Sequence, residues 1–359
     1  MSPPESDSPD DSLDHPLSNE ATGEAPAIVG PASALDVSLL IPTFNAGPEF
    51  PAILDAFVGQ RLAKPLEIVV VDSGSTDGTR ELLRQRAKQG QLELIEIPNH
   101  EFNHGATRNL GIAATHGDVV ALSVQDARPT DDQWLARLVA TYDDPQVAGA
   151  YSAQLPRHDA NPFIKDRLRS WVASQTEPRR QSVASVEEFE ALEPLEKLSR
   201  VAFDNVASSV RRSVVEAIPF RERQFGEDLD WGHRAILAGH TVVFEPRSQV
   251  IHSHDKSIWY EAKRVYLDHQ NLHRLFGVHT VPAWENVRAG TRWAIGHLQG
   301  VVDADPDLGP WQRRWWRAKA VPFGFSQNFA QFLGARSVAR LDAGDRFYRL
   351  LDRWLRRGV

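Results

Sequence analysis

The sequence predicts an α/β protein built on a doubly wound sheet, with a helical extension towards its C-terminal end. Three almost entirely apolar segments, at 37–42, 66–71 and 119–124, have the composition of strands buried on both faces of a parallel sheet. Segments whose apolar residues recur at helical spacing alternate with these strands, as in βαβ units. From residue 259 onward the pattern is mostly helical, and no internal repeat is visible.

The expected elements follow one another from residue 37. We expect strands and helices in alternation, with the strands at 37–42, 66–71, 92–97 and 119–124 and the helices at 49–60, 79–88, 107–115 and 131–142. Between 150 and 220 the pattern loosens, which predicts loops with one or two polar helices. A helix that reaches residue 238 is then followed by two short strands, at 241–244 and 250–254.

Composition and charge exclude several classes of protein. The 359 residues contain no Cys, which excludes a disulfide framework, a thiolate metal site and a cysteine nucleophile. No segment approaches about 18 consecutive apolar residues, and the N-terminus has neither the basic nor the apolar region of a secretory signal. The net charge of -8 argues against a nucleic-acid partner. Residues 1–35 are acidic and rich in Pro, Ser and Ala, which predicts a disordered leader.

Polar residues follow three of the predicted strands directly. They lie at 43–45, in the loop that begins at Asp72, and at 125–127. In doubly wound sheets ligands bind beyond the carboxyl ends of the strands, so the three clusters should converge on one cleft. Asp72, followed by small residues and a helix N-terminus, offers an acceptor and several N–H donors to a nucleotide. The alternative is that Asp72 and Ser75 only cap the helix.

A second polar group opens the helix predicted at 107–115. Arg108 and Asn109 lie in its first turn, which should face the same cleft. Both a guanidinium and a helix N-terminus favour a bound phosphate there. The alternative is a surface arginine in a capped helix. Neither a Gly-x-Gly-x-x-Gly fingerprint nor a Walker loop occurs where a nucleotide would need it.

Asp126 ends the fourth predicted strand, where a carboxylate can hold a divalent cation against a diphosphate. His252 and His254 alternate along a predicted strand, so they should point to opposite faces. We therefore expect at most one of them to join Asp126 easily. A structural histidine is the alternative role for either one.

Glu227 and Asp228 stand at the start of a predicted helix. Adjacent carboxylates repel each other, which can raise one pKa towards neutral pH and let that group act as a general base. The alternative is an acidic first turn that merely complements the helix dipole.

In this order and spacing the motifs resemble those of the inverting glycosyltransferases of family 2, which have the GT-A fold. The resemblance covers roughly residues 37–280 and rests on SLLIPTFN (38–45), IVVVDSGSTDGT (68–79), FNHGATRNLGI (102–112), SVQDARP (123–129) and GEDLDW (226–231). Within that family the sequence is most similar to bacterial rhamnosyltransferases. It shares with them FNHGATRN, QDA in place of Asp-x-Asp, Asn205 with the following Arg211 and Arg212, and His252-Ser253-His254.

The resemblance, together with the positions at strand ends, assigns a role to each candidate. Donor-binding residues would be Thr43, Asn45, Asp72, Ser75, Arg108, Asn109 and Gln125. Catalysis would depend on Asp228, with Glu227 beside it. A Mg or Mn ion would be held at Asp126, His252 and His254, although Val124 occupies the first acidic position of the family's metal motif. Acceptor contacts would come from Asn205, Trp231 and His233.

The implied reaction is a direct displacement at the anomeric carbon. Asp228 would take the proton of an acceptor hydroxyl, while the metal and Arg108 would stabilise the leaving diphosphate. The expected partners are a nucleotide-diphosphate sugar, rhamnose-like or hexose, and a glycan or polyprenyl-linked acceptor, in cell-surface polysaccharide synthesis. The alternative is a catalytically inactive partner protein that binds nucleotide sugars. A pyrophosphorylase would instead need a Gly-rich loop after the first strand, where Pro42-Thr43-Phe44-Asn45 stands.

These expectations divide the chain into a leader (1–35), a GT-A domain (36–255) and a helical, basic, Trp-rich region (256–359). Residues 310–359 carry a net charge of +8 and include Trp311, Trp315, Trp316 and Trp354. Trp and basic residues favour an anionic membrane surface, so one hypothesis is a cytoplasmic protein with peripheral contact to the inner face of the membrane. The other is that Trp and Arg pack the last helices onto the domain.

Overall fold

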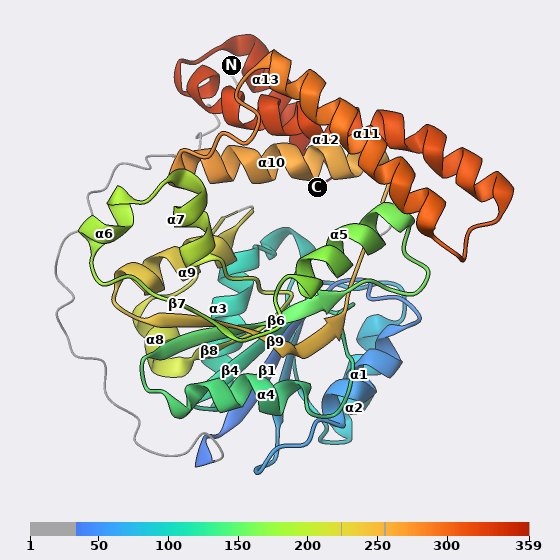
Figure 1. Ribbon diagram of the computed structural model, residues 1–359. Helices are drawn as coiled ribbons and strands as arrows, with labels where there is room; N and C mark the ends of the chain where they lie inside the picture. Colours follow the sequence, from blue (N-terminus) through green and yellow to red (C-terminus); the bar gives the residue numbers. More distant parts are fainter. Residues whose placement is uncertain (1–33, 224, 255, 359) are drawn as a thin grey trace, which may run out of the picture.

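The computed structural model describes residues 34–223, 225–254 and 256–358 of the chain (Figure 1). The predicted leader therefore lies almost wholly outside the described residues. The strands of the single sheet are β1 (Val37–Thr43), β2 (Glu67–Asp72), β3 (Glu93–Glu96), β4 (Val119–Ser123), β5 (Arg128–Pro129), β6 (Val147–Leu155), β7 (Arg179–Gln181), β8 (Ala207–Arg211) and β9 (Thr241–Ile251).

Helices cover both faces of this sheet, which confirms the α/β prediction. Those between the strands are α1 (Phe50–Val58), α2 (Thr79–Lys88), α3 (His104–Ala114), α4 (Trp134–Ala140), α5 (Pro162–Ala173), α6 (Val186–Ala191), α7 (Pro194–Val201), α8 (Arg212–Ala217) and α9 (Glu227–Leu237). Two apolar cores, one on each face, contain the large buried side chains Trp134 and Trp231 respectively.

The strand order is β3-β2-β1-β4-β8-β6-β9-β5, with β7 also paired to β9. Strands β1 to β4 of this path are parallel, whereas β8 is antiparallel to both of its neighbours, β4 and β6. The carboxyl ends of β1, β2, β4, β6 and β9 therefore lie at one edge of the sheet, and β8 begins at that same edge. Every polar loop singled out in the sequence leads into this edge.

The prediction of loops and polar helices between 150 and 220 was wrong, because this segment supplies β8 and most of β6. Both strands lie in the centre of the sheet, yet their sequences, VAGAYSAQL and ASSVR, contain few large apolar residues. All five residues of β8 are buried, and its serines form hydrogen bonds there, such as the one that Tyr142 Oη donates to Ser209 Oγ. Small and polar residues at these positions hid the strands from an argument based on apolar composition.

The two short strands expected at 241–244 and 250–254 are one strand, β9, which ends at Ile251. Its register with β6 shifts between the pairs Ser152–Glu245 and Ala153–Gln249. This irregularity accommodates Pro246, which has no N–H to donate to a regular ladder. Because β9 ends at Ile251, His252 and His254 lie beyond the strand.

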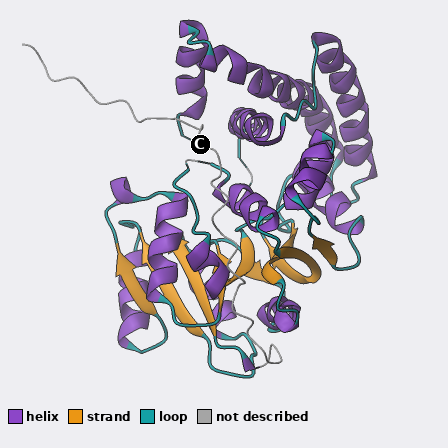
Figure 2. Cartoon of the chain, turned by 90° about the vertical axis from the view of Figure 1, so that its left-hand side faces the viewer, coloured by secondary structure: helices purple, strands orange, loops and turns teal. Residues whose placement is uncertain are grey.

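The chain after β9 forms the expected helical region. It consists of α10 (Ile258–Phe276), α11 (Trp284–Ala304), α12 (Pro310–Asp342) and α13 (Arg346–Arg356). Figures 1 and 2 show these helices as a separate layer beside the sheet domain. Apolar residues of α10, α12 and α13 form one core of this layer, and α5 packs against α11 and α12 through a second core. Within the described residues, no helix combines the length and apolarity needed to cross a membrane.

Candidate active site

The loops at the carboxyl edge of the sheet are joined by side-chain hydrogen bonds, so the predicted convergence occurs. Gln125, after β4, accepts a hydrogen bond from Phe44 N (2.6 Å) and donates one to Phe44 O (2.9 Å), after β1. Asn45 N donates to Ser75 Oγ (2.8 Å), and Asn45 Oδ1 accepts from Thr76 N (2.8 Å). Gln125 and Asn45 thus hold three strand-end loops together.

Asp72 is fully buried and accepts hydrogen bonds from its own loop. Its carboxylate accepts from Gly74 N (3.1 Å), Ser75 N (3.0 Å) and Ser75 Oγ (2.5 Å). Thr43 is also buried, and its hydroxyl donates to Ile41 O (3.3 Å). The capping alternative therefore describes the contacts of Asp72 and Ser75 well, and a nucleotide would meet the rim of this loop.

Arg108 lies one turn into α3 and makes a buried ion pair with Glu227. Its Nη1 is 2.6 Å from Glu227 Oε1 and also donates to His104 O (3.1 Å). The helix begins three residues before the predicted start, because Asn103 Oδ1 caps it by accepting from Gly105 N and Ala106 N.

Asn109 acts as a clamp between α3 and the loop that precedes α9. Its amide donates to Phe220 O (2.7 Å) and accepts from Phe220 N (3.0 Å). Both polar groups of the Asn109 side chain are used in this way. The structure therefore supports a structural role for Asn109 rather than the predicted contact with a donor.

Asp126, His252 and His254 come together as a candidate metal site. His252 Nε2 is 3.6 Å from Asp126 Oδ1, and His254 Nδ1 is 3.5 Å from Asp126 Oδ2. One potential ligand atom from each residue lies within 4.8 Å of the other two. The expectation that only one histidine would reach Asp126 was wrong, because both follow the end of β9 and strand alternation does not apply to them.

The set of donors fits a divalent cation, since it combines one carboxylate with two imidazoles. Burial lowers the pKa of His252 to about 4 and also lowers that of His254, so both rings are neutral at physiological pH, as metal ligands must be. His252 Nδ1 lies 2.9 Å from Gln154 Oε1, which only accepts. The proton of His252 is therefore on Nδ1, and the lone pair of Nε2 faces Asp126.

Gln154 is held in this orientation by Asp204, a residue that the sequence analysis did not single out. The Gln154 amide nitrogen donates to Asp204 Oδ2, and Val206 N donates to Asp204 Oδ1 (2.8 Å). The carboxylate of Asp204 therefore turns the amide oxygen of Gln154 towards His252. This contact links the metal site to the neighbourhood of the candidate base.

Asp228 lies half-buried at the start of α9, next to Asp204. Burial, with the negative charge of Glu227, raises the pKa of Asp228 to about 6. Burial also raises the pKa of Asp204, and the charge of Asp228 adds to this effect. Asp228 accepts from Leu229 N (2.7 Å) and from Asn205 N (3.3 Å), which fix its orientation. A carboxylate with such a pKa is ionised at neutral pH and basic enough to accept a proton.

The three predicted acceptor residues lie in different surroundings. Asn205 is buried beside Asp228, and its Nδ2 has no hydrogen-bond partner among the described residues. Trp231 is fully buried between Phe203 and Phe220, with its ring nitrogen donating to Ile218 O. It fills the core and does not reach a cleft.

His233 packs between the rings of Phe189 (5.0 Å) and Phe276 (5.3 Å). These neighbours come from α6 and α10, and the burial they cause lowers the pKa of His233. His233 Nε2, like Asn205 Nδ2, has no hydrogen-bond partner among the described residues, but of the two residues only Asn205 is hydrogen-bonded to Asp228.

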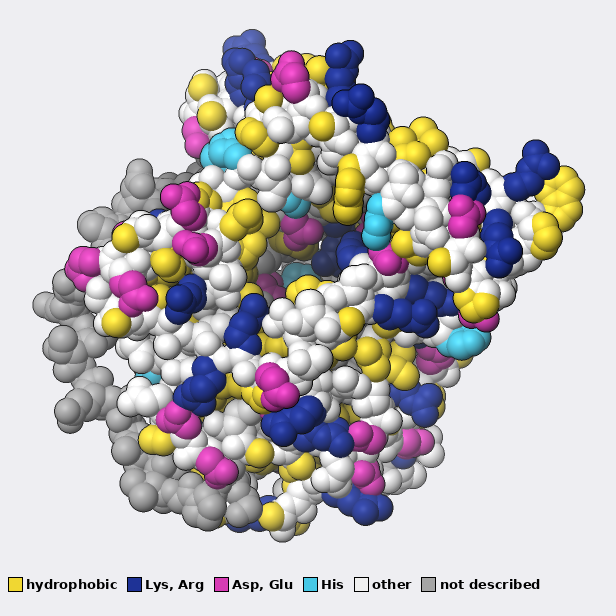
Figure 3. Space-filling view, viewed as in Figure 1, with side chains coloured by type: hydrophobic (Ala, Val, Ile, Leu, Met, Phe, Trp, Pro, Cys, Tyr) yellow, Lys and Arg dark blue, Asp and Glu magenta, His cyan; other side chains and the backbone are white. Residues whose placement is uncertain are grey.

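Helix α10 adds two charged residues to the site. The positive charge of Arg264 acts on Asp204, His252 and His254, and its guanidinium lies 5.6 Å from the centre of the Phe225 ring. Burial raises the pKa of Asp268 to about 6, and Asp228 contributes to this shift. Figure 3 shows the molecule hollowed between the sheet domain and the helical layer, with acidic, basic and histidine side chains gathered inside.

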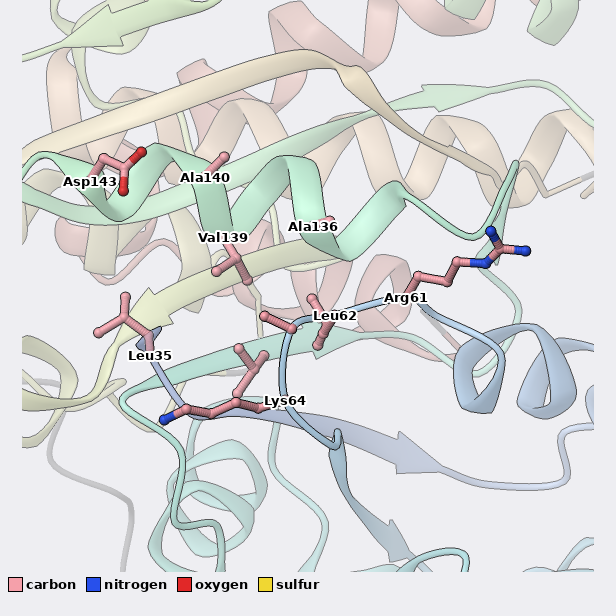
Figure 4. A pocket seen from close by; sticks show the side chains of 10 residues that line it. Leu35, Arg61, Leu62, Lys64, Ala136, Val139, Ala140 and Asp143 are labelled. Carbon is pink, nitrogen blue, oxygen red and sulfur yellow. The ribbon is translucent and has the colours of Figure 1, made fainter. Parts of the chain in front are cut away.

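An apolar pocket lies at the other end of the strands from the candidate active site (Figure 4). It has a volume of about 280 Å³ and is lined by Leu35, Val37, Leu62 and Val139 among others. Val37 starts β1, whereas the polar loops follow the end of that strand. The apolar lining and this position separate the pocket from the candidate chemistry.

Comparison with known proteins agrees with these observations. The sequence profile described as Glycosyl transferase family 2 matches residues 38–198. The O-antigen chain rhamnosyltransferase RfbN of Salmonella typhimurium is 32% identical over 235 residues, which are 65% of this chain and 71% of that protein. The chain belongs to glycosyl transferase family 2. The O-antigen chain rhamnosyltransferase WbaN of Salmonella anatum is 31% identical over 233 residues, which are 64% of this chain and 70% of that protein.

This family 2 member is a glycosyltransferase, and its mixed sheet with flanking helices is the GT-A fold that the sequence motifs implied. A solved structure, the mannosyltransferase PcManGT of Pyrobaculum calidifontis in complex with GDP-Man and Mn²⁺, aligns over 92% of this chain and 87% of its own. The identity is 19% and the TM-score 0.46.

Sequence reasoning missed Gln154, Asp204, Arg264 and Asp268. Asp204 and Gln154 belong to the segment in which β6 and β8 were not predicted, so nothing placed them at the sheet edge. A signal was present, because Asp204 directly precedes Asn205, a residue of the family resemblance. Arg264 and Asp268 are separated by one helical turn on α10. The sequence predicted this helix but not which of its faces lies against the sheet domain.

Proposed function

We propose that this glycosyltransferase moves a rhamnose-like sugar or a hexose from a nucleotide diphosphate to a hydroxyl of a glycan or lipid-linked acceptor, with inversion, in cell-surface polysaccharide synthesis. The relatives named O-antigen chain rhamnosyltransferase support this class of reaction. The observation that carries the proposal is Asp228, a half-buried carboxylate whose pKa is raised to about 6 beside a buried amide with a free donor.

In the proposed mechanism Asp228 accepts the proton of the acceptor hydroxyl as that oxygen attacks the anomeric carbon. Asn205 N and Leu229 N hold the carboxylate, and Asn205 Nδ2 is placed to donate a hydrogen bond to the acceptor. The ion pair between Arg108 and Glu227 fixes the first turn of α9 against α3. One base is sufficient, because an inverting displacement forms no covalent intermediate.

Asp126, His252 and His254 would hold a divalent cation next to the leaving diphosphate. A cation bound there supplies positive charge where the leaving group becomes negative. Two imidazoles among three ligands favour Mn²⁺ over Mg²⁺, because Mg²⁺ prefers oxygen ligands. The donor itself would lie along the joined loops of Asn45, Ser75 and Gln125.

We further propose that the chain is divided as the sequence suggests, into a GT-A domain (36–255) and a helical region (256–359) that contacts a membrane surface peripherally. Trp311, Trp315 and Trp354 are 81%, 51% and 50% exposed on the helical region. Trp316 is different, since it packs against Phe163 of α5. The polyprenyl-linked class of acceptor would give such a surface a purpose.

The test is product formation by the purified full chain. A panel of nucleotide sugars is screened first by thermal shift with and without Mn²⁺, since a ligand of the folded state raises the melting temperature. Donors that bind are then assayed with lipid-linked and free glycan acceptors, and the anomeric configuration of the product is determined by NMR. Donor binding without any product would favour the inactive partner protein, and retention of configuration would contradict the single-base mechanism.

A further inference from the structure

A cavity of about 530 Å³ lies between the sheet domain and the helical layer, apart from the donor and metal residues assigned above. Its walls come from the N-terminus of α3, the loop before α9, α10 and α13. The residues that matter for its chemistry are Asn103, His104, Arg223, Phe225, Arg353 and Arg356. Among the described lining residues three are Arg and none is Asp or Glu, so the cavity suits an anion.

Positive charge exceeds negative charge around this cavity. Asp230 is shared by three guanidinium groups, those of Arg221 (3.6 Å), Arg223 (2.8 Å) and Arg234 (2.9 Å). One carboxylate cannot neutralise three cations, so the Arg223 wall of the cavity keeps a net positive charge.

The α13 wall is also cationic. Arg356 is positioned by Asp352, with 2.7 Å between Nε and Oδ2, and by the side chain of Gln270. Arg353, one turn earlier, is exposed and has no carboxylate within 4 Å among the described residues. Its guanidinium is therefore available to a ligand, and a phosphate group is the anion that guanidinium groups bind best.

Two segments that line the cavity lead along the chain to the candidate base and to the ion pair beside it. Phe225 lines the cavity, and Asp228 follows three residues later. On the other side His104 lines it, and Arg108, which bonds to His104 O, reaches across to Glu227. The N-terminus of α3 also faces the cavity through Asn103 and His104, and its dipole favours a negative charge. A ligand held here would extend naturally towards the hydroxyl acceptor position at Asp228.

We propose that this cavity binds the phosphate or diphosphate group through which the acceptor glycan is attached to a lipid. The proposal rests on the proposed function, because it identifies the acceptor of the same reaction. Helix α13 supplies Arg353 and Arg356 to the cavity, while Phe347, Leu350 and Trp354 on the same helix are 68%, 65% and 50% exposed. An anionic group joined to an apolar chain could contact the arginines of α13 with its charge and the exposed apolar residues of α13 with its chain. The cavity volume is sufficient for a diphosphate with its first sugar.

The experiment measures binding by isothermal titration calorimetry, with the full chain, at low salt, without donor and without divalent cation. The probes are inorganic diphosphate, farnesyl diphosphate and farnesol, which separate the anion from the apolar chain. The variant is Arg353→Gln, which removes an exposed residue that anchors nothing. Its matched control is Arg346→Gln, an exposed arginine of the same helix outside the cavity. Asp126→Ala serves as the control for the donor cleft.

We expect the wild-type chain to bind both diphosphates, farnesyl diphosphate more tightly, and farnesol weakly or not at all. Arg353→Gln should weaken both diphosphates by about tenfold or more, the scale of a lost charge-assisted hydrogen bond. Arg346→Gln and Asp126→Ala should bind as the wild type does.

Three results would overturn the site, and a fourth would overturn its lipid-linked source. Absence of diphosphate binding to the wild type would remove the site, and equal weakening in Arg346→Gln would show only a diffuse charge effect. Tighter diphosphate binding by Asp126→Ala would place the anion in the donor cleft, because without a cation the Asp126 carboxylate repels an anion bound there. Equal affinity for inorganic and farnesyl diphosphate would support an anion site but contradict the lipid-linked source. Because no donor is present, these outcomes do not depend on whether sugar transfer is later observed.

Discussion

Arg108 and Glu227 form an ion pair across 119 positions of sequence, with 2.6 Å between Nη1 and Oε1. Their side chains are only 6% and 7% exposed. The pair joins α3 to the first residue of α9 and so fixes the backbone that carries Asp228. It also engages the guanidinium that the sequence assigned to the leaving diphosphate. The ion pair of Arg108 and Glu227 therefore stabilises the position of Asp228. This role does not depend on whether Arg108 also contacts a donor.

Breaking this pair should lower the stability of the fold. We expect Arg108→Ala to reduce the free energy of unfolding by about 3–5 kcal/mol, because Glu227 is left as a buried charge without a partner. Arg84→Ala is the matched control, since Arg84 pairs with Glu96 at the surface and is 49% exposed; its loss should cost less than about 1 kcal/mol. Chemical denaturation measures both.

A double variant tests the assignment further. Arg108→Met combined with Glu227→Leu should recover most of the lost stability, because apolar residues of similar size replace the pair. If Arg108→Ala instead unfolds at the same denaturant concentration as the wild type and only loses donor affinity, the arginine serves the diphosphate and the structural role is wrong.

Replacing the candidate base should separate catalysis from binding. We expect Asp228→Asn to lower turnover by about 100-fold or more, the usual loss for a general base, with donor affinity nearly unchanged. The same variant should be more stable than the wild type at pH 8. The pKa of Asp228 in the folded protein, about 6, lies above its value in the unfolded chain. The protonated carboxyl therefore adds to the free energy of unfolding below about pH 4, and this stabilisation is lost as the pH rises through 6.

The stability gain of Asp228→Asn should therefore shrink between pH 8 and pH 5, as measured by denaturant titrations at both values. A wild-type rate on the true acceptor would disprove the assignment of the base. A gain of stability that does not depend on pH would show that packing, and not charge, causes it.

The activity of the wild type should fall on the acidic side with an apparent pKa near 6, since Asp228 must be ionised to accept a proton. The negative charges of Asp204 and Asp228 repel each other, and this repulsion raises the pKa of Asp204. In Asp204→Asn that repulsion is removed, so the acid limb of the kcat/KM profile should move to lower pH. Ser209→Ala, a buried change in the same strand region without a charge, is the control. An unmoved acid limb would mean that another group titrates.

Much of this site was predictable from the sequence because its residues follow large apolar strands. Asp72, Asp126 and Asn45 each come directly after such a strand, and the rule that ligands bind at the carboxyl edge placed them together. Asp228 was found through a motif at the start of a helix. In each of these cases local sequence was enough to fix the position of the side chain in the fold.

The remainder depended on contacts between distant segments. Asp204 and Gln154 were missed because β8 and β6 are built from small residues, and their burial comes from neighbours rather than from their own apolarity. The contacts of Trp231 and Asn109 could not be predicted from the sequence for a related reason. Each could equally face a cleft or a neighbouring segment, and only the packing of Trp231 against Phe203 and the bonds of Asn109 to Phe220 decide which.

Both histidines should contribute to metal binding. We expect His252→Ala and His254→Ala each to weaken Mn²⁺ binding, because both ring nitrogens lie within 3.6 Å of Asp126. Gln154→Leu should weaken it by about 10- to 100-fold, since the leucine cannot accept the proton of His252 Nδ1. Electron paramagnetic resonance of free Mn²⁺ measures the affinity without any assay of turnover.

Gln249→Leu is the matched control for Gln154→Leu, because Gln249 lies in β9 and its amide only donates to Pro246 O. Equal losses in the two variants would mean that the pairing of β6 with β9 is merely disturbed. Full activity in the presence of a chelator would leave Asp126 as a hydrogen-bonding residue and would remove the metal from the mechanism.

The last prediction concerns the exposed apolar residues of α13. Phe347, Leu350 and Trp354 recur at helical spacing, and Arg346, Arg349, Arg353 and Arg357 surround them. An apolar stripe bordered by arginines is the pattern of a helix that lies on an anionic membrane surface. We expect the full chain to co-sediment with vesicles that contain anionic lipid, and less with neutral vesicles or at high salt.

Phe347→Ser combined with Leu350→Ser should weaken this binding by about tenfold or more, because each removes an apolar side chain that the interface would bury. Point variants are preferable to deletion from Pro310 onward, since α12 packs along α10 and its removal would expose that helix. Leu195→Ser is the matched control, because Leu195 is 59% exposed on α7, outside α13. If the wild type ignores anionic vesicles at low salt, or if Leu195→Ser loses as much binding as the α13 variant, these residues are not a membrane surface and the basic tail serves only the packing of the last helices.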